Sequence, residues 1–170
     1  MSQATAAVTM KGNPVTLLGT DVKVGSPAPD CTLVAQDLSE FKLSSVKGKT
    51  VIISVVPSLD TGICNLQTKR FNKEAEALGD QVKVLTISMD LPFAQKRWCG
   101  AANAENVIVV SDHRDAAFGQ AYGLLIKGLR LLARAVLIVD ANGTLRYKQI
   151  VPEITTEPDY TDALNALKKI

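Results

Sequence analysis

The chain has 170 residues, of which 46% are hydrophobic and 21% are charged, as in an ordinary globular domain, and we expect one domain over residues 1–170. The formal net charge is only +2 and no basic cluster stands out, so the composition does not indicate a nucleic-acid partner. No apolar run is long enough to span a bilayer, and residues 1–9 lack the cationic and apolar regions of a secretory signal.

The N-terminal part of the chain predicts short paired strands. Residues 7–10 and 15–18 flank the turn residues Lys11-Gly12-Asn13-Pro14, a pattern typical of a β-hairpin. Residues 32–35 and 40–43 predict a second short strand pair. We therefore expect a β-hairpin extension before the main body of the fold.

From residue 50 onward, predicted strands and helices alternate. Apolar and β-branched runs predict strands over 50–56, 82–88, 107–110, 135–140 and 145–150, and helical periodicity predicts helices over 65–78, 92–98, 114–122 and 159–169. Strand–helix–strand crossovers require parallel central strands, and Asn142-Gly143 predicts a hairpin at one edge. This order predicts an α/β protein whose mixed central sheet is flanked by helices on both faces.

The chain contains three widely spaced cysteines: Cys31, Cys64 and Cys99. An odd number at such spacing is a poor framework for structural disulfides and predicts a reducing compartment, here the cytoplasm. We expect no metal site, because the chain has no C-x-x-C pair and the single His113 has no neighbouring ligand residue.

Cys64 is predicted to lie in the first turn of the helix that follows strand 50–56. Unpaired N–H groups and a partial positive charge at a helix N-terminus stabilise anions, so a thiol there is expected to be partly thiolate, its nucleophilic form. The alternative is a small hydrophobic residue buried near a helix start. The position alone leaves both interpretations open.

The loop Pro57-Ser58-Leu59-Asp60-Thr61-Gly62-Ile63-Cys64 resembles the active-site loop of peroxiredoxins, and its full string is similar to the thiol peroxidase branch. Residues 88–95, 132–136 and 153–160 resemble the same branch in the same order. The resemblance extends from about Val8 to Leu167. It implies a thioredoxin-like fold, which agrees with the predicted order of elements.

The resemblance implies a thiol-dependent peroxidase that reduces hydrogen peroxide and alkyl hydroperoxides, with no cofactor because sulfur carries the electrons. Cys64 matches the peroxidatic residue, whose thiolate becomes a sulfenic acid. Cys99 matches the resolving residue, which would form an intramolecular disulfide that a thioredoxin-type partner reduces. The family further implies a homodimer. Cys31 matches neither position, and we assign it no chemistry.

Three more residues are expected to serve Cys64. The resemblance implies that Thr61 bonds the peroxide or the thiolate, although the residue type alone predicts a helix N-cap. It implies that Pro57 covers the thiolate, although a proline there also ends a strand. It implies that the Arg134 guanidinium lies beside the thiolate and holds the peroxide, although an arginine at a strand start more often reaches the surface.

Cys99 is expected on the helix after the next strand, beside Trp98, where core packing is the alternative to a resolving role. A disulfide requires Cα atoms within roughly 7 Å, so we expect oxidation to need local unwinding around Cys64 or Cys99. Met89, Leu91 and Phe93 are candidates for the wall of an alkyl hydroperoxide pocket, and are equally ordinary as packing residues.

Two other functions fit the same residues. One is thiol–disulfide exchange on the same fold, which the lack of a C-x-x-C pair disfavours. The other is a non-enzymatic redox sensor or binding module that uses a Cys64–Cys99 switch. Peroxide turnover far faster than that of a free thiol would distinguish the peroxidase from both.

Overall fold

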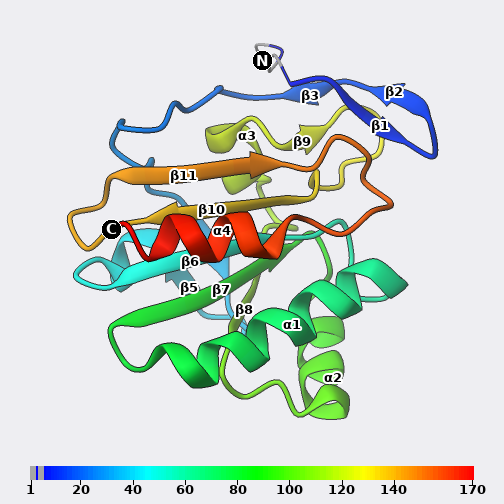
Figure 1. The fold of residues 1–170 in the computed structure, drawn as a ribbon. Helices are drawn as coiled ribbons and strands as arrows, with labels where there is room; N and C mark the ends of the chain where they lie inside the picture. The colour runs from blue at the N-terminus through cyan, green and yellow to red at the C-terminus, as the bar shows by residue number, and fades with distance from the viewer. Residues whose placement is uncertain (1–2, 4–5) are drawn as a thin grey trace.

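The computed structural model describes residue 3 and residues 6–170 (Figure 1). Four helices and a short 3-10 helix alternate with eleven strands in these residues. The helices are α1 (Gly62–Leu78), α2 (Pro92–Ala102), α3 (Ala117–Tyr122), α4 (Tyr160–Leu167) and η1 (Leu43–Val46). The strands are β1 (Val8–Met10), β2 (Asn13–Val15), β3 (Leu17–Leu18), β4 (Thr32–Val34), β5 (Glu40–Lys42), β6 (Thr50–Val55), β7 (Val82–Ser88), β8 (Ile108–Ser111), β9 (Leu125–Ile126), β10 (Ala135–Val139) and β11 (Leu145–Ile150).

Seven strands form the central sheet, in the order β11-β10-β6-β7-β8-β4-β5. The central strands β6, β7 and β8 are parallel, whereas β10 and β11 on one side and β4 and β5 on the other are antiparallel. The predicted mixed sheet is therefore confirmed. The strand pair formed by β4 and β5 adds a second antiparallel edge, which the sequence analysis did not assign to this sheet.

The helices cover both faces of the sheet, with α1 and α4 in front of it and α3 behind it in Figure 1. Successive strand residues point to opposite faces, and β6 separates the core accordingly. Ile52 packs in one cluster with Phe71 of α1, and Trp98 of α2 packs against that cluster. Ile53 packs in the other cluster with Phe118 of α3. Helices α1 and α2 share a face because both β–α–β crossovers run in the same direction along the sheet.

The N-terminal hairpin is confirmed with a tighter turn than the one predicted. Strand β2 begins at Asn13, so the connection between β1 and β2 consists of Lys11 and Gly12. Both residues have positive φ, at 50° and 80°, as a two-residue turn of type I′ requires. The second half of the predicted strand forms β3, which pairs with β9 instead.

The structure also shifts the bounds of all four predicted helices, since α1 begins at Gly62 and α4 spans Tyr160–Leu167, and it adds one strand. Helix α2 continues to Ala102, beyond the predicted end at Trp98. Helix α3 begins at Ala117 because the Asp112 carboxylate accepts the N–H groups of Phe118 and Gly119. Strand β9 has two residues, too few for an alternating pattern to reveal it.

Three chain segments meet where β6 ends. Strand β6 runs into the loop before α1, and the Val56 N–H donates to the Ile87 carbonyl of β7. Strand β10 is antiparallel to β6 and pairs Ala135 with Val55, so the preceding Arg134 lies beside the end of β6. The carboxyl ends of parallel strands commonly carry the functional site of α/β proteins. The topology therefore brings Arg134 to the helix that carries Cys64.

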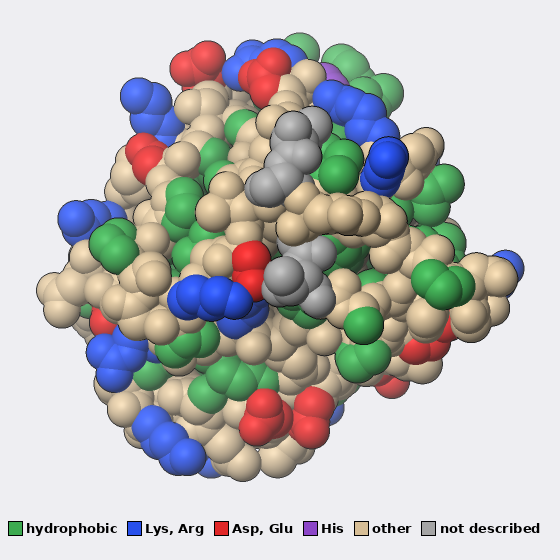
Figure 2. Space-filling model, turned by 90° about the horizontal axis from the view of Figure 1, so that it is seen from above, with side chains coloured by type: hydrophobic (Ala, Val, Ile, Leu, Met, Phe, Trp, Pro, Cys, Tyr) green, Lys and Arg blue, Asp and Glu red, His purple; other side chains and the backbone are tan. Residues whose placement is uncertain are grey.

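Seen from above, the surface carries acidic, basic and hydrophobic side chains that are interspersed (Figure 2). This mixture agrees with the small net charge of the chain. Within the described residues, no helix is both long enough and apolar enough to cross a membrane.

Candidate active site

Cys64 is the third residue of α1 and is completely buried. Thr61 occupies the N-cap with an extended backbone, and its carbonyl accepts the Asn65 N–H at 3.0 Å. The Thr61 hydroxyl, however, donates to the Ser58 carbonyl at 3.1 Å. Thr61 is therefore the N-cap residue by its backbone position, as predicted, but its hydroxyl does not cap the N–H groups of the first helical turn.

Arg134 is 2% exposed and points its guanidinium at the start of α1. Its Nη2 donates to Cys64 Sγ at 3.3 Å, its Nη1 to Gln67 Oε1 at 2.9 Å, and its Nε to the Ile154 carbonyl at 2.8 Å. The alternative of a surface arginine is therefore wrong. Two segments, α1 and the loop that contains Ile154, hold the planar guanidinium against the sulfur atom.

Arg134 has no carboxylate partner among the described residues, whose ion pairs all involve other side chains. A buried cation is costly unless a negative charge or strong hydrogen bonds compensate it. Of the three groups that accept from Arg134, only the Cys64 thiol can become an anion. The buried guanidinium therefore donates to the sulfur atom of the one acceptor that can carry a negative charge.

Gln67 is a site residue that the sequence analysis missed. It is completely buried one turn after Cys64, where it accepts from Arg134 and donates from Nε2 to Ser54 Oγ at 2.8 Å. The amide thus fixes the orientation of the guanidinium without adding a charge. A polar residue on the buried face of a helix, three positions after Cys64, is the sequence signal that points to it.

A cavity of about 640 Å³ opens beside these residues, within the size range of small-molecule sites. Pro57, Thr61 and Arg134 line it, as do Gly62 and Ile63 next to Cys64. The structure therefore brings four of the predicted site residues together, since Cys64 contacts Arg134. The other lining residues are Met10, Lys11, Ser58, Asn65, Leu66, Leu131, Ile154 and Thr155. The contributions of the N-terminal hairpin and of Thr155 were not predicted.

Met89, Leu91 and Phe93 lie elsewhere in the described structure and do not line this cavity. Leu91 and Phe93 are 53% and 65% exposed at the start of α2. Met89 is partly buried against the core cluster on the α3 side of the sheet. Their predicted role in a substrate pocket is not supported by their placement in this chain.

Asp90 is a second residue that the sequence analysis missed. Its carboxylate accepts from Ser58 Oγ at 2.6 Å, from the Leu59 N–H at 2.8 Å and from Ser88 Oγ at 2.7 Å. It thereby ties the loop before α1 to the end of β7. The residue lies within the stretch 88–95, but an isolated aspartate before a helix carries no signal for this role.

Cys99 lies on α2 and is half-buried, and all three cysteines are free thiols. Gln36 Nε2 donates to Cys99 Sγ at 3.4 Å, and burial raises the pKa of the Cys99 thiol. Its neighbour Trp98 donates from Nε1 to Oδ1 of Asn65 at 3.0 Å. The residues adjacent to the two cysteines are thus hydrogen-bonded to each other across α1 and α2.

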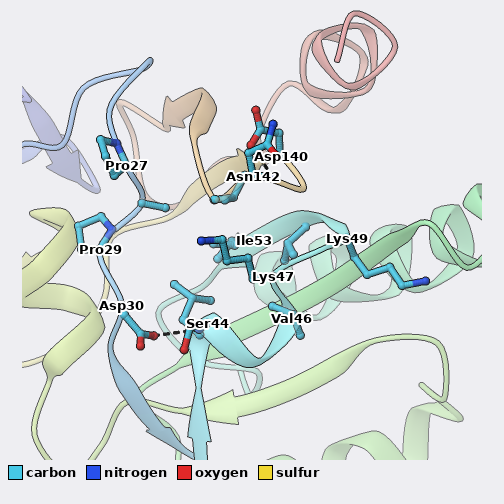
Figure 3. Close-up of a pocket in the computed structure, with 15 residues that line it drawn as sticks. Pro27, Pro29, Asp30, Ser44, Val46, Lys47, Lys49, Ile53, Asp140 and Asn142 are labelled. Atoms are coloured by element: carbon cyan, nitrogen blue, oxygen red, sulfur yellow. Dashed lines mark hydrogen bonds between the residues drawn. The ribbon is translucent and has the colours of Figure 1, made fainter.

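A second cavity of about 230 Å³ contains none of the predicted catalytic residues (Figure 3). Asp30, whose carboxylate accepts the Ser44 N–H at 2.8 Å, and Lys47 are among the residues that border it. The buried Asp140 on its wall is satisfied by the N–H groups of Asn142 and Thr144. Nothing in this cavity suggests a reactive group, and we assign the candidate active site to the cavity beside Arg134.

Comparisons with known proteins identify the family of the chain. Residues 23–164 match the Redoxin family model. The chain is 56% identical to a thiol peroxidase of Halalkalibacterium halodurans and 54% identical to one of Bacillus subtilis, over 96% and 97% of this chain and 98% of each relative. A peroxiredoxin-like protein from Aquifex aeolicus superposes with a TM-score of 0.90 at 45% identity, over 99% of both chains.

A thiol peroxidase from Chromobacterium violaceum has a TM-score of 0.86 at 20% identity, over 96% of both chains, and that likeness supports the fold alone. The thioredoxin-like fold and the family resemblance are both confirmed. The chain belongs to the redoxin family and, within it, to the thiol peroxidases, which are peroxiredoxin enzymes.

Proposed function

We propose that Cys64 is the peroxidatic residue of this thiol peroxidase, that Cys99 resolves it, and that a thioredoxin-type dithiol restores both thiols. The observation that supports this proposal best is the hydrogen bond of 3.3 Å from Arg134 to Cys64 Sγ. Arg134 is buried and forms no ion pair with a carboxylate among the described residues. A peroxidase needs a thiolate, because the thiol itself is a poor nucleophile. Arg134 supplies the compensating charge at the sulfur atom.

In the first step, the Cys64 thiolate attacks the terminal oxygen of the hydroperoxide. A sulfur–oxygen bond forms, the O–O bond breaks, and the leaving alkoxide or hydroxide takes the electron pair and a proton. The sulfur is oxidised to sulfenic acid while the peroxide is reduced to alcohol or water. In this proposal, Arg134 and the N–H groups of the first turn of α1 stabilise the departing oxygen, Thr61 orients the peroxide, and Pro57 limits the access of water. The support is that Pro57, Thr61 and Arg134 line the same cavity.

In the second step, the Cys99 thiol attacks the Cys64 sulfenic acid, forming a disulfide and releasing water. Cys64 is completely buried near the start of α1, and Cys99 lies on a separate packed helix. We therefore propose that the first turn of α1 or the adjacent part of α2 unwinds on oxidation. The Trp98–Asn65 hydrogen bond is expected to break in that change.

A dithiol of the thioredoxin type then exchanges with this disulfide, which returns both cysteines to thiols and leaves the partner oxidised. The proposal also includes a cytoplasmic homodimer. Its support is family membership together with three cysteines that are free thiols, as a reducing compartment would keep them. Light scattering of the purified protein tests the dimer.

The proposal is tested by peroxide consumption with thioredoxin, thioredoxin reductase and NADPH. The wild type should turn over. Cys99→Ser should gain one oxygen by mass spectrometry when peroxide is added, yet fail to turn over with thioredoxin. Turnover of Cys99→Ser at the wild-type rate would contradict the resolving role. A wild type that exchanges disulfides but reacts with peroxide no faster than free cysteine would contradict the peroxidase itself.

A further inference from the structure

The Glu153 carboxylate joins two segments that flank the catalytic cavity. From the N-terminal hairpin, Oε1 accepts from Thr9 Oγ1 at 3.0 Å and from the Gly12 N–H at 2.8 Å, and Oε2 accepts from the Lys11 N–H at 3.2 Å. From its own loop, Oε2 accepts from the Thr155 N–H at 2.9 Å and from Thr155 Oγ1 at 2.6 Å. One side chain thus receives five hydrogen bonds.

The hairpin turn depends on this carboxylate in particular. Lys11 and Gly12 both have positive φ, and their consecutive N–H groups point to Glu153. A lysine in the left-handed region is disfavoured, so the turn needs an interaction that compensates it. A carboxylate that accepts both N–H groups provides such an interaction.

The residues that Glu153 holds are part of the cavity wall. Lys11 and Thr155, which bond to the carboxylate, line the cavity, as does Met10 before the turn. The segment 57–63 lines the same cavity, and the hydrogen bonds of Cys64 and Arg134 go to groups other than this carboxylate. Glu153 therefore shapes the space available to a substrate without touching the reacting atoms.

The base of the hairpin and the position of Arg134 have supports of their own. The Thr9 N–H donates to the Pro152 carbonyl at 2.8 Å, and the Ile154 N–H donates to the Thr9 carbonyl at 2.9 Å. Arg134 is held by Gln67 as well as by the Ile154 carbonyl. Loss of the carboxylate should therefore loosen the hairpin turn and leave the Arg134–Cys64 contact in place.

We propose that Glu153 is a positioning residue that fastens the hairpin turn as a wall of the peroxide cavity, and thereby determines how well bulky organic hydroperoxides bind. This inference rests on the proposed peroxidase function. A bulky substrate needs the wall for its apolar contacts, whereas hydrogen peroxide is too small to reach it. The same hydrogen bonds lower the pKa of Glu153 to about 2, with those from Thr155 the largest cause, so the carboxylate stays ionised in mildly acidic solution.

The test compares Glu153→Gln with the wild type, using cumene hydroperoxide and hydrogen peroxide as substrates. The glutamine side chain has nearly the same shape but keeps a single acceptor oxygen. We expect KM for cumene hydroperoxide to rise about fivefold or more with kcat nearly unchanged, as loss of uniform binding predicts, while kcat/KM for hydrogen peroxide stays within about twofold. Amide hydrogen exchange at Lys11 and Gly12 should become faster.

Glu157→Gln is the matched control, because Glu157 lies in the same loop but its carboxylate accepts from Tyr160. It should leave both substrates unaffected. Thr9→Val removes one donor from the hairpin side and should show a smaller selective rise in KM. An equal loss on both peroxides, unchanged KM for cumene hydroperoxide, or unchanged exchange at the turn would overturn the inference. A wild type without peroxidase activity would instead refute the proposed function.

Discussion

Cys64 and Cys31 are both buried thiols, but they are buried with charges of opposite sign. Cys64 lies against the Arg134 guanidinium, with no carboxylate paired to that cation among the described residues. Cys31 lies near two carboxylates, and burial, followed by the charges of Asp112 and Asp30, raises its pKa to about 12. Burial is therefore common to both sites, and the neighbouring charge is what differs.

The comparison shows that burial alone does not decide the reactivity of a thiol. Burial disfavours any charged form, and a cation or an anion in contact then shifts the balance in opposite directions. The fold places a cation at Cys64, because the antiparallel pairing of β10 with β6 brings Arg134 beside the end of β6. The predictions below alter one side of the comparison at a time.

The largest effect is expected for Cys64→Ser, and Cys31→Ser is its matched control. Cys64→Ser should abolish peroxide consumption, because a serine hydroxyl is not ionised near neutral pH and cannot form a sulfenic acid. Cys31→Ser should keep nearly the wild-type rate, since that thiol remains protonated. Steady-state assays with thioredoxin check both variants. An active Cys64→Ser protein would remove the basis of the mechanism.

Arg134→Met should slow the reaction with peroxide by about 10- to 150-fold, because a hydrogen bond to a charged group contributes roughly 1.5–3 kcal/mol. Single-turnover oxidation followed by mass spectrometry measures this rate. Thermal unfolding serves as a check, since the substitution also leaves the Ile154 carbonyl without its donor. Arg146→Met, at an arginine paired with Asp140 on β11, is the control and should react normally.

Gln67→Glu should make the Cys64 site resemble the Cys31 site. It would give Arg134 a carboxylate of nearly identical shape at the 2.9 Å contact, and the Ser54 hydroxyl can turn to donate to it. The new anion would compete with the thiolate for the guanidinium, so we expect peroxide reactivity to fall by about tenfold. Gln120→Glu, on α3 across the sheet, is the control. An unchanged rate would mean that the charge balance around Arg134 is unimportant.

The smallest effect concerns Cys31 at alkaline pH. Its pKa is raised from 9.0 to about 12, so the protonated thiol stabilises the folded protein below about pH 9, and this contribution is lost as the pH rises toward about 12. In a Cys64→Ser, Cys99→Ser background, alkylation of Cys31 should remain slow near pH 9 until the protein unfolds. Rapid alkylation there would show that the two carboxylates and burial do not protect it.

The sequence predicted the parts of the site that depend on local pattern. A strand followed by a helix placed Cys64 in the first helical turn. The motif around it identified Pro57 and Thr61, and the resemblance of residues 132–136 identified Arg134. Met89, Leu91 and Phe93 were offered as pocket residues on apolar character alone, and α2 turns two of them to solvent. Apolar character alone does not predict which side chains at the start of a helix are buried, because that depends on how the preceding loop positions the helix.

Gln67, Asp90 and Glu153 escaped prediction for a common reason. Each is a polar residue with at least one partner far away in the chain, as in the hydrogen bond from the Gly12 N–H to Glu153 across 141 positions. Such contacts depend on register and loop path, which a single sequence does not reveal. The pairing of β3 with β9 was missed for a different reason: strands of two residues are too short to show an alternating pattern.

The most direct test of this account is the fraction of Cys64 present as thiolate near neutral pH, measured by ultraviolet absorbance in a Cys31→Ser, Cys99→Ser protein and in the same protein with Arg134→Met. The account predicts that this fraction falls sharply when Arg134 is lost. Equal ionisation in the two proteins, or a wild-type Cys64 as protonated as free cysteine, would contradict it.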